Sequence, residues 1–164
     1  MRLTLAALLL AATGALAGRA QTPAPAAPKT PKLSFLYSLN CTLGPSLDVG
    51  PSPVGSRVVI PITGGTFSGP KLSGKVFNLG ADWGLIDAKG TFSADTRYHL
   101  QTDDGAHIFI RTSGPAQADG RLHLRLQFET GSEKYYWLNN IVAVGILKVE
   151  GSTALIDAWM LEGN

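Results

Sequence analysis

Strict alternation of apolar and polar side chains at residues 121–128, RLHLRLQF, constrains the fold of this chain more than any other feature. The even-numbered positions carry leucine or phenylalanine, and the odd-numbered positions carry arginine, histidine or glutamine. Successive side chains of a β-strand point to opposite faces, so a period of two predicts a strand with one face in the core and the other in water.

Similar runs recur along most of the chain, at residues 33–41, 57–63, 91–103, 107–112, 141–149 and 154–161. In the first run we expect one buried face made of Leu33, Phe35, Tyr37, Leu39 and Cys41. Glycine-containing pairs mark reversals between runs, and Asp104-Gly105 in particular predicts a β-hairpin. The one helical candidate is residues 133–140, EKYYWLNN, which we expect to form one or two helical turns.

Many short strands separated by turns are typical of a β-sandwich or a β-barrel. We expect an all-β, antiparallel, barrel-like sheet of about eight to ten strands, because closure removes exposed strand edges. A flattened sandwich is the alternative.

Three segments are expected along the chain. Residues 1–20 read as a signal peptide, with a basic start, a short Leu/Ala run and small residues that allow cleavage after Ala17 or Ala20. Residues 21–32, QTPAPAAPKTPK, read as a Pro/Ala-rich tether. Residues 33–164 would form a single β-barrel domain. We therefore expect export to the periplasm or the medium.

Composition removes several classes of function. Loss of the leader takes Arg2 and Arg19 and leaves twelve basic side chains against twelve acidic ones. Such a neutral chain attracts nucleic acid weakly, so we expect no nucleic-acid partner. The apolar run of the leader is too short to span a bilayer, so no integral membrane protein is expected. Cys41 is the single cysteine, which excludes an internal disulfide, and we expect it to be buried and unreactive.

No cofactor or metal is expected. Gly69, Gly74 and Lys75 fit the spacing of a phosphate-binding loop, but Pro70 removes one N–H donor and Val76 replaces the hydroxyl residue that would bind Mg²⁺. The three histidines lie in separate predicted strands and lack the spacing of metal ligands.

Several longer motifs together carry a family resemblance. They are IPITGGTFSGPKLSGKV, GADWGLID, GTFSADTRYHLQTDDGAHIFIRTSG, FETG and YYWLNNIVAVG. In this order they resemble the bacterial and fungal family known as domain of unknown function 3237, from about residue 34 to near the C-terminus. The resemblance implies a compact β-barrel-like fold and supplies no activity. The leader and the tether depart from the family's common pattern.

Candidate site residues fall into a ligand-binding set and an acid–base set. An indole ring can stack on a flat ligand, guanidinium groups can clamp it, and an amide can orient it. The ligand-binding candidates at the predicted barrel mouth are Trp83, Arg97, Arg111, Trp137 and Asn139. Asp104 and Glu129 are the acid–base candidates, although Asp104 is also a typical turn residue.

Three functions remain open from the sequence. The first is an exported barrel that binds an unknown small molecule. The second is a cofactor-free isomerase, cyclase or hydrolase that uses a carboxylate and arginines at the mouth. The third is a structural or interaction protein with a filled barrel. A cavity with a carboxylate of raised pKa would favour the enzyme.

Overall fold

The computed structural model describes residues 27–162, so the predicted signal peptide and the first half of the predicted tether lie outside the described residues. Nine strands and one short 3₁₀ helix make up the fold. In chain order they are β1 (Lys32–Leu43), β2 (Leu47–Ser52), β3 (Gly55–Ser68), β4 (Ser73–Ile86), β5 (Phe92–Thr102), β6 (His107–Pro115), β7 (Leu122–Glu129), η1 (Glu133–Asn140), β8 (Ala143–Glu150) and β9 (Thr153–Glu162).

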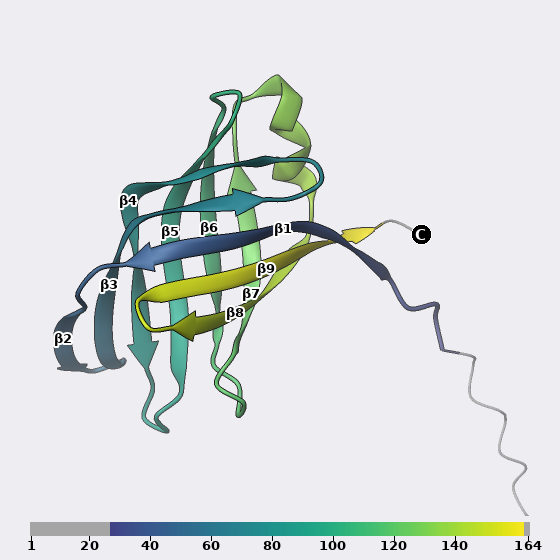
Figure 1. The fold of residues 1–164 in the computed structure, drawn as a ribbon. Coiled ribbons are helices and arrows are strands. Elements are labelled where there is room, and N and C mark those ends of the chain that lie inside the picture. Colours follow the sequence, from purple (N-terminus) through teal and green to yellow (C-terminus); the bar gives the residue numbers. More distant parts are fainter. Residues whose placement is uncertain (1–26, 163–164) are drawn as a thin grey trace, which may run out of the picture. The chain divides into compact units, whose positions relative to one another are not determined.

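Eight of the strands form a closed antiparallel barrel, as the alternation predicts. The hydrogen-bonded order runs β1-β9-β8-β7-β6-β5-β4-β3, and a second pairing of β1 with β3 closes the ring (Figure 1). The ninth strand, β2, continues along the edge of β3. The expectation of a short helix near residues 133–140 is confirmed by η1.

The closing seam is shared by two strands. Residues 62–68 of β3 pair with β1, and the last pair is Leu43 with Ile62. Residues 55–59 of β3 pair with β2 instead. Between these two pairings the Gly44 amide donates to the Pro61 carbonyl oxygen at 2.8 Å, so β1 and β2 follow one another along the same edge of β3.

The hairpins use one common turn. Gly90, Gly105 and Gly120 each have a positive φ near 85°, and each amide donates to the carbonyl oxygen three residues earlier. This geometry is a type I turn followed by a left-handed residue, a common three-residue hairpin connection. The reversal at Asp104-Gly105 is thus confirmed, but the type I′ turn that an Asp-Gly pair favours is not formed, because only the glycine has a positive φ.

In β5 and β7 the face that alternation predicts to be buried is the face that lies in the core. Every even-numbered residue of β7 is buried and every odd-numbered one is exposed. In β1 the expectation for Leu33 and Phe35 is wrong. The pairing of β1 with β9 shifts register between Phe35 and Tyr37, so Tyr37 is buried while Leu33 and Phe35 face outward. Phe35 packs edge-on against Trp159 of β9, with ring centroids 6.2 Å apart.

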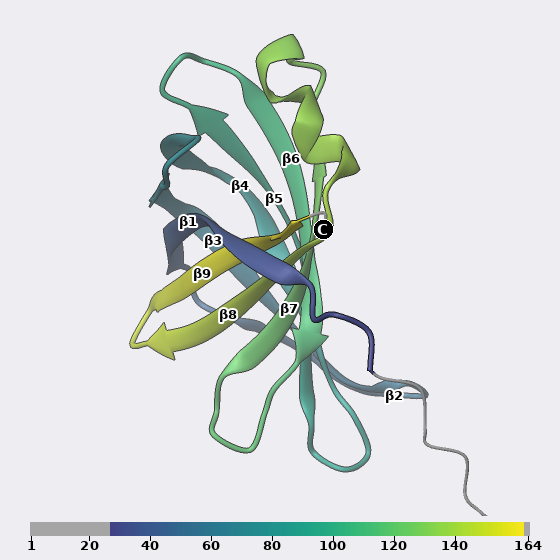
Figure 2. The ribbon, with the colours of Figure 1, turned by 90° about the vertical axis from the view of Figure 1, so that its right-hand side faces the viewer.

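The two ends of the barrel differ. η1 lies at one end, and the turns between β4 and β5 and between β6 and β7 lie at the other (Figures 1 and 2). Tyr135 and Leu138 of η1 are buried and belong to the hydrophobic core. The η1 end is therefore filled by side chains.

Candidate functional site

A cavity of about 80 Å³ lies inside the barrel, toward the end away from η1. Its lining residues come from the strand ends nearest the hairpin turns and from the seam. They are Cys41, Leu43, Ile60, Ile62, Asp82, Phe92, Thr96, Tyr98, Thr112, Leu122, Leu147, Val149, Ala154 and Ile156. Val149 is exposed and Leu43, Ile60 and Phe92 are half-buried, so the cavity reaches the surface beside these residues.

The size of this cavity sets what it can hold. A water molecule occupies about 30 Å³ in the liquid, and a drug-sized ligand fills a pocket of roughly 300 Å³ or more. The cavity therefore has room for one small ring or a short branch of a ligand. The remainder of a larger molecule would extend through the open end.

Asp82 is the one acidic or basic residue that lines the cavity. It lies on β4 between Ile60 of β3 and Thr96 of β5, its cross-strand partners, and those partners share its face of the sheet. Its Oδ1 accepts a hydrogen bond from the Asp95 amide at 2.8 Å. Burial raises the pKa of the Asp82 carboxyl, and the bonds from the Asp95 amide and the Thr96 hydroxyl partly oppose this rise.

The hydroxyls of Tyr98 and Tyr37 are buried in the barrel and have no hydrogen-bond partner among residues 27–162. Tyr98 lines the cavity and is 2% exposed. Burial raises the pKa of both phenols, and the neighbouring Tyr37 and Cys41 add to the rise at Tyr98. Tyr98, on β5, thus comes close to groups on β1.

Cys41 is buried, as the sequence predicts. Burial raises the pKa of its thiol to about 11, so the thiol stays protonated near neutral pH. A protonated thiol is a weak nucleophile, and this residue contributes apolar surface to the cavity instead.

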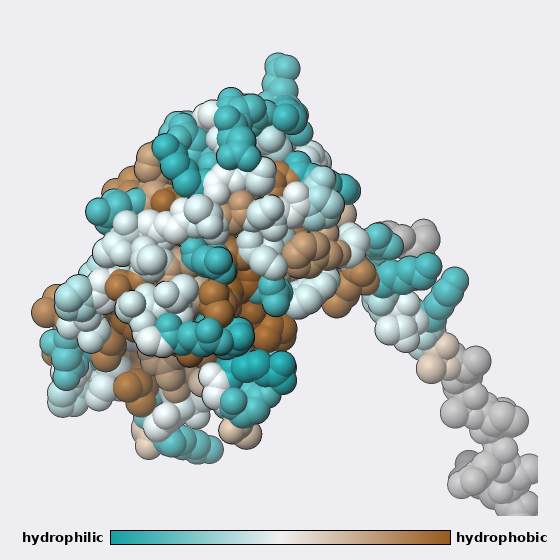
Figure 3. All heavy atoms as spheres, viewed as in Figure 1, coloured by the Kyte–Doolittle hydropathy of each residue, from teal (hydrophilic) through white to brown (hydrophobic). Residues whose placement is uncertain are grey.

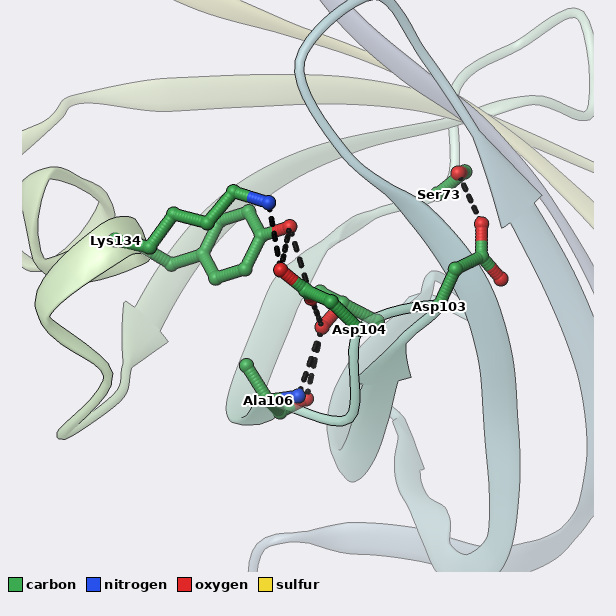
Figure 4. Close-up of polar contacts among 7 residues, drawn as sticks. Ser73, Asp103, Asp104, Ala106 and Lys134 are labelled. Atoms are coloured by element: carbon green, nitrogen blue, oxygen red, sulfur yellow. Dashed lines mark hydrogen bonds and ion pairs between the residues drawn. The ribbon is translucent and has the colours of Figure 1, made fainter.

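Asp104 lies at the filled end of the barrel, where it ties the β5–β6 turn to η1 (Figure 4). Its carboxylate accepts hydrogen bonds from Lys134 at 2.6 Å, from Thr102 at 2.5 Å and from the Tyr135 hydroxyl at 3.1 Å. The Lys134 and Thr102 bonds lower the pKa of Asp104 to about 2. Such a carboxylate is a weak base at neutral pH, and it does not line the interior cavity.

Glu129, Trp137 and Asn139 also lie outside the cavity lining. Glu129 ends β7 on the outer surface, opposite Phe109 of β6. The Asn139 side chain holds the backbone of Thr130 through two hydrogen bonds of 2.9 Å. The Lys71 ammonium lies 5.3 Å from the centroid of the Trp137 ring. The functional roles of these residues stay predictions.

Trp83, Arg97 and Arg111 come together on the outer face of β4, β5 and β6. Arg97 and Arg111 are direct cross-strand partners, and Asp95 accepts from them at 3.4 Å and 3.3 Å. The Arg97 guanidinium lies 5.7 Å from the centroid of the Trp83 ring. Trp83 and Arg97 line an open hollow of about 380 Å³, whereas Arg111 lines a separate one of about 310 Å³ together with Glu129. A binding role for these residues stays a prediction for the outer surface.

Within residues 27–162, no three His, Cys, Asp or Glu side chains are placed to hold a metal ion. No helix in that range is long and apolar enough to cross a bilayer.

Sequence reasoning placed Tyr98 on the apolar face of its strand, but it did not identify Asp82, Thr96 and Tyr98 as lining residues of one cavity. The alternation of β5 did contain a signal, since Thr96 shares the face of Tyr98 and Leu100. Nothing in the local sequence of β4 marks Asp82 as inward, because its neighbours Ala81 and Trp83 are the more apolar residues.

Sequence comparison identifies relatives over most of the chain. The family described as "Protein of unknown function (DUF3237)" matches residues 31–122 and 115–161. A Penicillium herquei protein named hydroalkoxylation enzyme phnH is 34% identical over 147 residues, which cover 90% of this chain and 95% of that protein. A UPF0311 protein of Rhodopseudomonas palustris strain TIE-1 is 29% identical over an aligned region that covers 78% of this chain and 96% of that protein.

Solved structures share the fold. A β-barrel-like protein of Acinetobacter baumannii superposes with a TM-score of 0.78 and 38% identity, covering 84% of this chain and 100% of that one. An enzyme from Penicillium herquei superposes with a TM-score of 0.72 and 34% identity, covering 85% of this chain and 100% of that one.

Proposed function

The chain belongs to the DUF3237 family, and we propose that it is an exported protein that binds a small molecule inside its β-barrel. The observation that carries this proposal is the interior cavity, which is apolar over most of its wall and open at one end. Ligand sites are typically concave and mostly apolar, with a few convergent polar groups. Here Asp82 and Thr96 are the candidates for those groups.

The interior cavity is a better candidate than the outer hollow beside Trp83. The outer hollow is open to solvent, and Arg97, which lines it, already pairs with the Asp95 carboxylate. A ligand there would compete with water and with an existing ion pair. A ligand inside the barrel would instead lose contact with water over most of its surface.

Titration with benzene, followed by ¹H–¹⁵N NMR, tests this proposal. We expect shifts of amides in β1, β5 and β9 that border the cavity. Ala154→Leu fills the cavity and should weaken benzene binding by at least about tenfold, since the lost space excludes the ring. Trp83→Ala, on the outer face, is the matched control and should leave binding unchanged. Shifts confined to the outer face, or none at all, would refute the proposal.

Export rests on the leader at residues 1–20. N-terminal sequencing of protein recovered outside the cytoplasm after expression of the full chain should begin at Gly18 or Gln21. Recovery of the whole chain from the cytoplasm, with Met1 retained, would count against export. Native mass spectrometry of the exported protein would then identify any compound that co-purifies with it.

A cofactor-free acid–base enzyme is the second candidate. It is favoured by the similarity to the hydroalkoxylation enzyme and by Asp82, whose pKa is raised by burial. Hydroalkoxylation adds an alcohol O–H across a carbon–carbon double bond. In this proposal Asp82 takes the hydroxyl proton as the C–O bond forms, and a proton from its carboxyl reaches the other alkene carbon, so that nothing is consumed.

The enzyme proposal is tested with a phenol that carries an ortho alkenyl chain, incubated with the protein in D₂O. Cyclisation with one deuterium on the former alkene carbon is the expected result. Asp82→Asn should lower the rate about 10²–10⁴-fold, the usual contribution of a positioned acid or base. Equal rates for wild type and Asp82→Asn would exclude this role for Asp82 and leave the binding proposal intact.

A further inference from the structure

The outer hollow beside Trp83 is shaped by a bulge in β4. The pairing of β4 with β5 shifts register between Val76 and Gly80, and the extra residues of β4 include Leu79, whose exposed side chain lines the hollow. A Cβ at Gly80 would overlap the carbonyl oxygen of Arg97, so glycine lets the two strands approach closely at the bulge. Ala81 follows with only a methyl group, which leaves room between its larger neighbours.

Apolar and aromatic side chains make most of the wall of this hollow. Leu79 and Trp83 come from β4 and Phe109 from β6, and both of these aromatic residues are half-buried. The His99 ring of β5 lies 5.5 Å from the Phe109 ring, centroid to centroid. The volume of about 380 Å³ is within the usual range for a small ligand. Because the hollow is open on its outer side, a flat ring lying against the wall fits it best.

The charge of the outer hollow comes from Arg97, which is the one Lys, Arg, Asp or Glu residue in its lining. Asp95 does not line the hollow, and it is shared by Arg97 and Arg111, so positive charge exceeds negative charge in this group. Glu129 lines the separate hollow of Arg111. A ligand in the outer hollow therefore meets a guanidinium group and no carboxylate.

The pairing with Asp95 leaves most of the Arg97 guanidinium available. Its bond to Asp95 measures 3.4 Å, whereas strong charge-assisted hydrogen bonds measure about 2.7–2.9 Å. Within residues 27–162 this is the one hydrogen bond that the Arg97 side chain donates, although a guanidinium carries several N–H donors. An anion can therefore bind Arg97 from the side of the hollow without displacing Asp95.

We propose that the outer hollow is a second binding site, selective for small aromatic carboxylates. The carboxylate pairs with Arg97, and the ring lies against Trp83 and Phe109. The interior cavity disfavours the same ligands, because no Lys, Arg or His lines it and an anion there would lack a counter-charge. The inference goes beyond the proposed function, since the two sites lie on opposite faces of the sheet and neither needs the other.

Three probes separate the contributions of charge and ring. Benzoate and benzamide have nearly the same shape and differ in charge, and acetate has the carboxylate without the ring. Each is titrated by ¹H–¹⁵N NMR into wild type, Arg97→Gln, Trp83→Ala and Arg125→Gln. Arg125 is exposed on the outer face of β7 and lines neither outer hollow, so its replacement removes an equal charge elsewhere and is the matched control.

Benzoate should shift the amides of residues 79–83, 97–99 and 109, and its ring protons should give NOEs to the Leu79 methyl groups, a result that needs no variant. Arg97→Gln should weaken benzoate about threefold to tenfold, as expected for an exposed hydrogen bond between charged groups, and leave benzamide unchanged. Trp83→Ala should weaken both ring compounds. Arg125→Gln should change none of the affinities, and acetate should bind more weakly than benzoate.

Several outcomes overturn the inference. Equal losses of benzoate affinity in Arg97→Gln and Arg125→Gln would show a general effect of surface charge. Equal losses of benzoate and benzamide in Arg97→Gln would show that the carboxylate is not recognised, and equal affinities of acetate and benzoate would show that the ring is not. Benzoate shifts confined to β1 and β9, or none at all, would also contradict it. Each of these leaves the proposed function to the separate titration with benzene.

Discussion

Asp82 and Asp104 have pKa values shifted in opposite directions, because one is buried in the barrel and the other is paired at its surface. Burial raises the pKa of Asp82. This shift makes the unfolding free energy depend on pH. The contribution of Asp82 to that free energy is complete below its pKa in the unfolded chain, about 3.9, and is lost as pH rises through its pKa in the folded protein. Asp104 behaves oppositely. Its contribution is present above about 3.9 and is lost as pH falls toward 2.

Asp82→Asn should therefore gain unfolding free energy relative to wild type as pH rises above 4, until Asp82 is fully ionised. The asparagine keeps an oxygen that can accept from the Asp95 amide, so the change removes the charge and little else. Urea unfolding at a series of pH values from 3 to 8 measures the difference. A difference that does not vary with pH would show that Asp82 is not destabilised by burial.

At the scale of elements, η1 is held to the β5–β6 turn by the Asp104 contacts (Figure 4). Asp104→Asn should raise the rate of amide hydrogen exchange in η1 at neutral pH, because the ion pair with Lys134 and part of the bonding to Tyr135 are lost. The exposed pair contributes little to global stability, so the midpoint of thermal unfolding should change by only a few degrees or less.

Asp119→Asn is the matched control for this prediction. Asp119 also pairs with a cation at 2.6 Å, and hydrogen bonds from Arg121 lower its pKa, but both residues lie in the turn between β6 and β7. Loss of the Asp119–Arg121 pair should leave the rate of amide hydrogen exchange in η1 unchanged. Equal exchange of η1 in the two variants would mean that buried Tyr135 and Leu138 hold the helix without Asp104.

The sequence predicts some strands completely and others poorly, for physical reasons. In β7 every polar residue faces water, so alternation alone gives the strand and its buried face. In β4 the odd-numbered face carries Phe77, Leu79 and Trp83, yet it is the outer face, with Leu79 61% exposed. Cross-strand register decides this, since Asp82 pairs with inward Thr96, and register depends on residues far apart in the chain.

At the scale of the whole molecule, closure and the cavity depend on contacts that no local pattern contains. Short alternating runs gave the class of fold and the approximate strand number. They did not specify that one edge of β3 pairs with β2 along its first residues and with β1 along its last ones. Apolar side chains lie among polar ones on the face of β1, β9 and β8 (Figure 3), so surface polarity does not mark the opening either.

The closing seam itself depends on Gly65, which pairs with Cys41 of β1. Its φ is 142°, and a Cβ at this position would overlap the carbonyl oxygen of Asn40 on β1. Gly65→Ala should therefore destabilise the protein by about 1–3 kcal/mol, the usual cost of a residue in such a strained backbone region. Urea unfolding measures this loss, and Gly131→Ala, where a Cβ would meet nothing within 4 Å, should change stability much less.

The same variant tests whether the seam supports the cavity. Cys41 and Ile62 border the cavity and lie on the two strands that Gly65 brings together, so a looser seam should widen the space between them. Hydrogen exchange in Gly65→Ala should rise in residues 38–43 and 64–68 while β6 and β7 keep their protection, and benzene should bind more weakly. Uniform loss of protection around the barrel would instead show that the eight strands open as one unit and that the seam has no separate role.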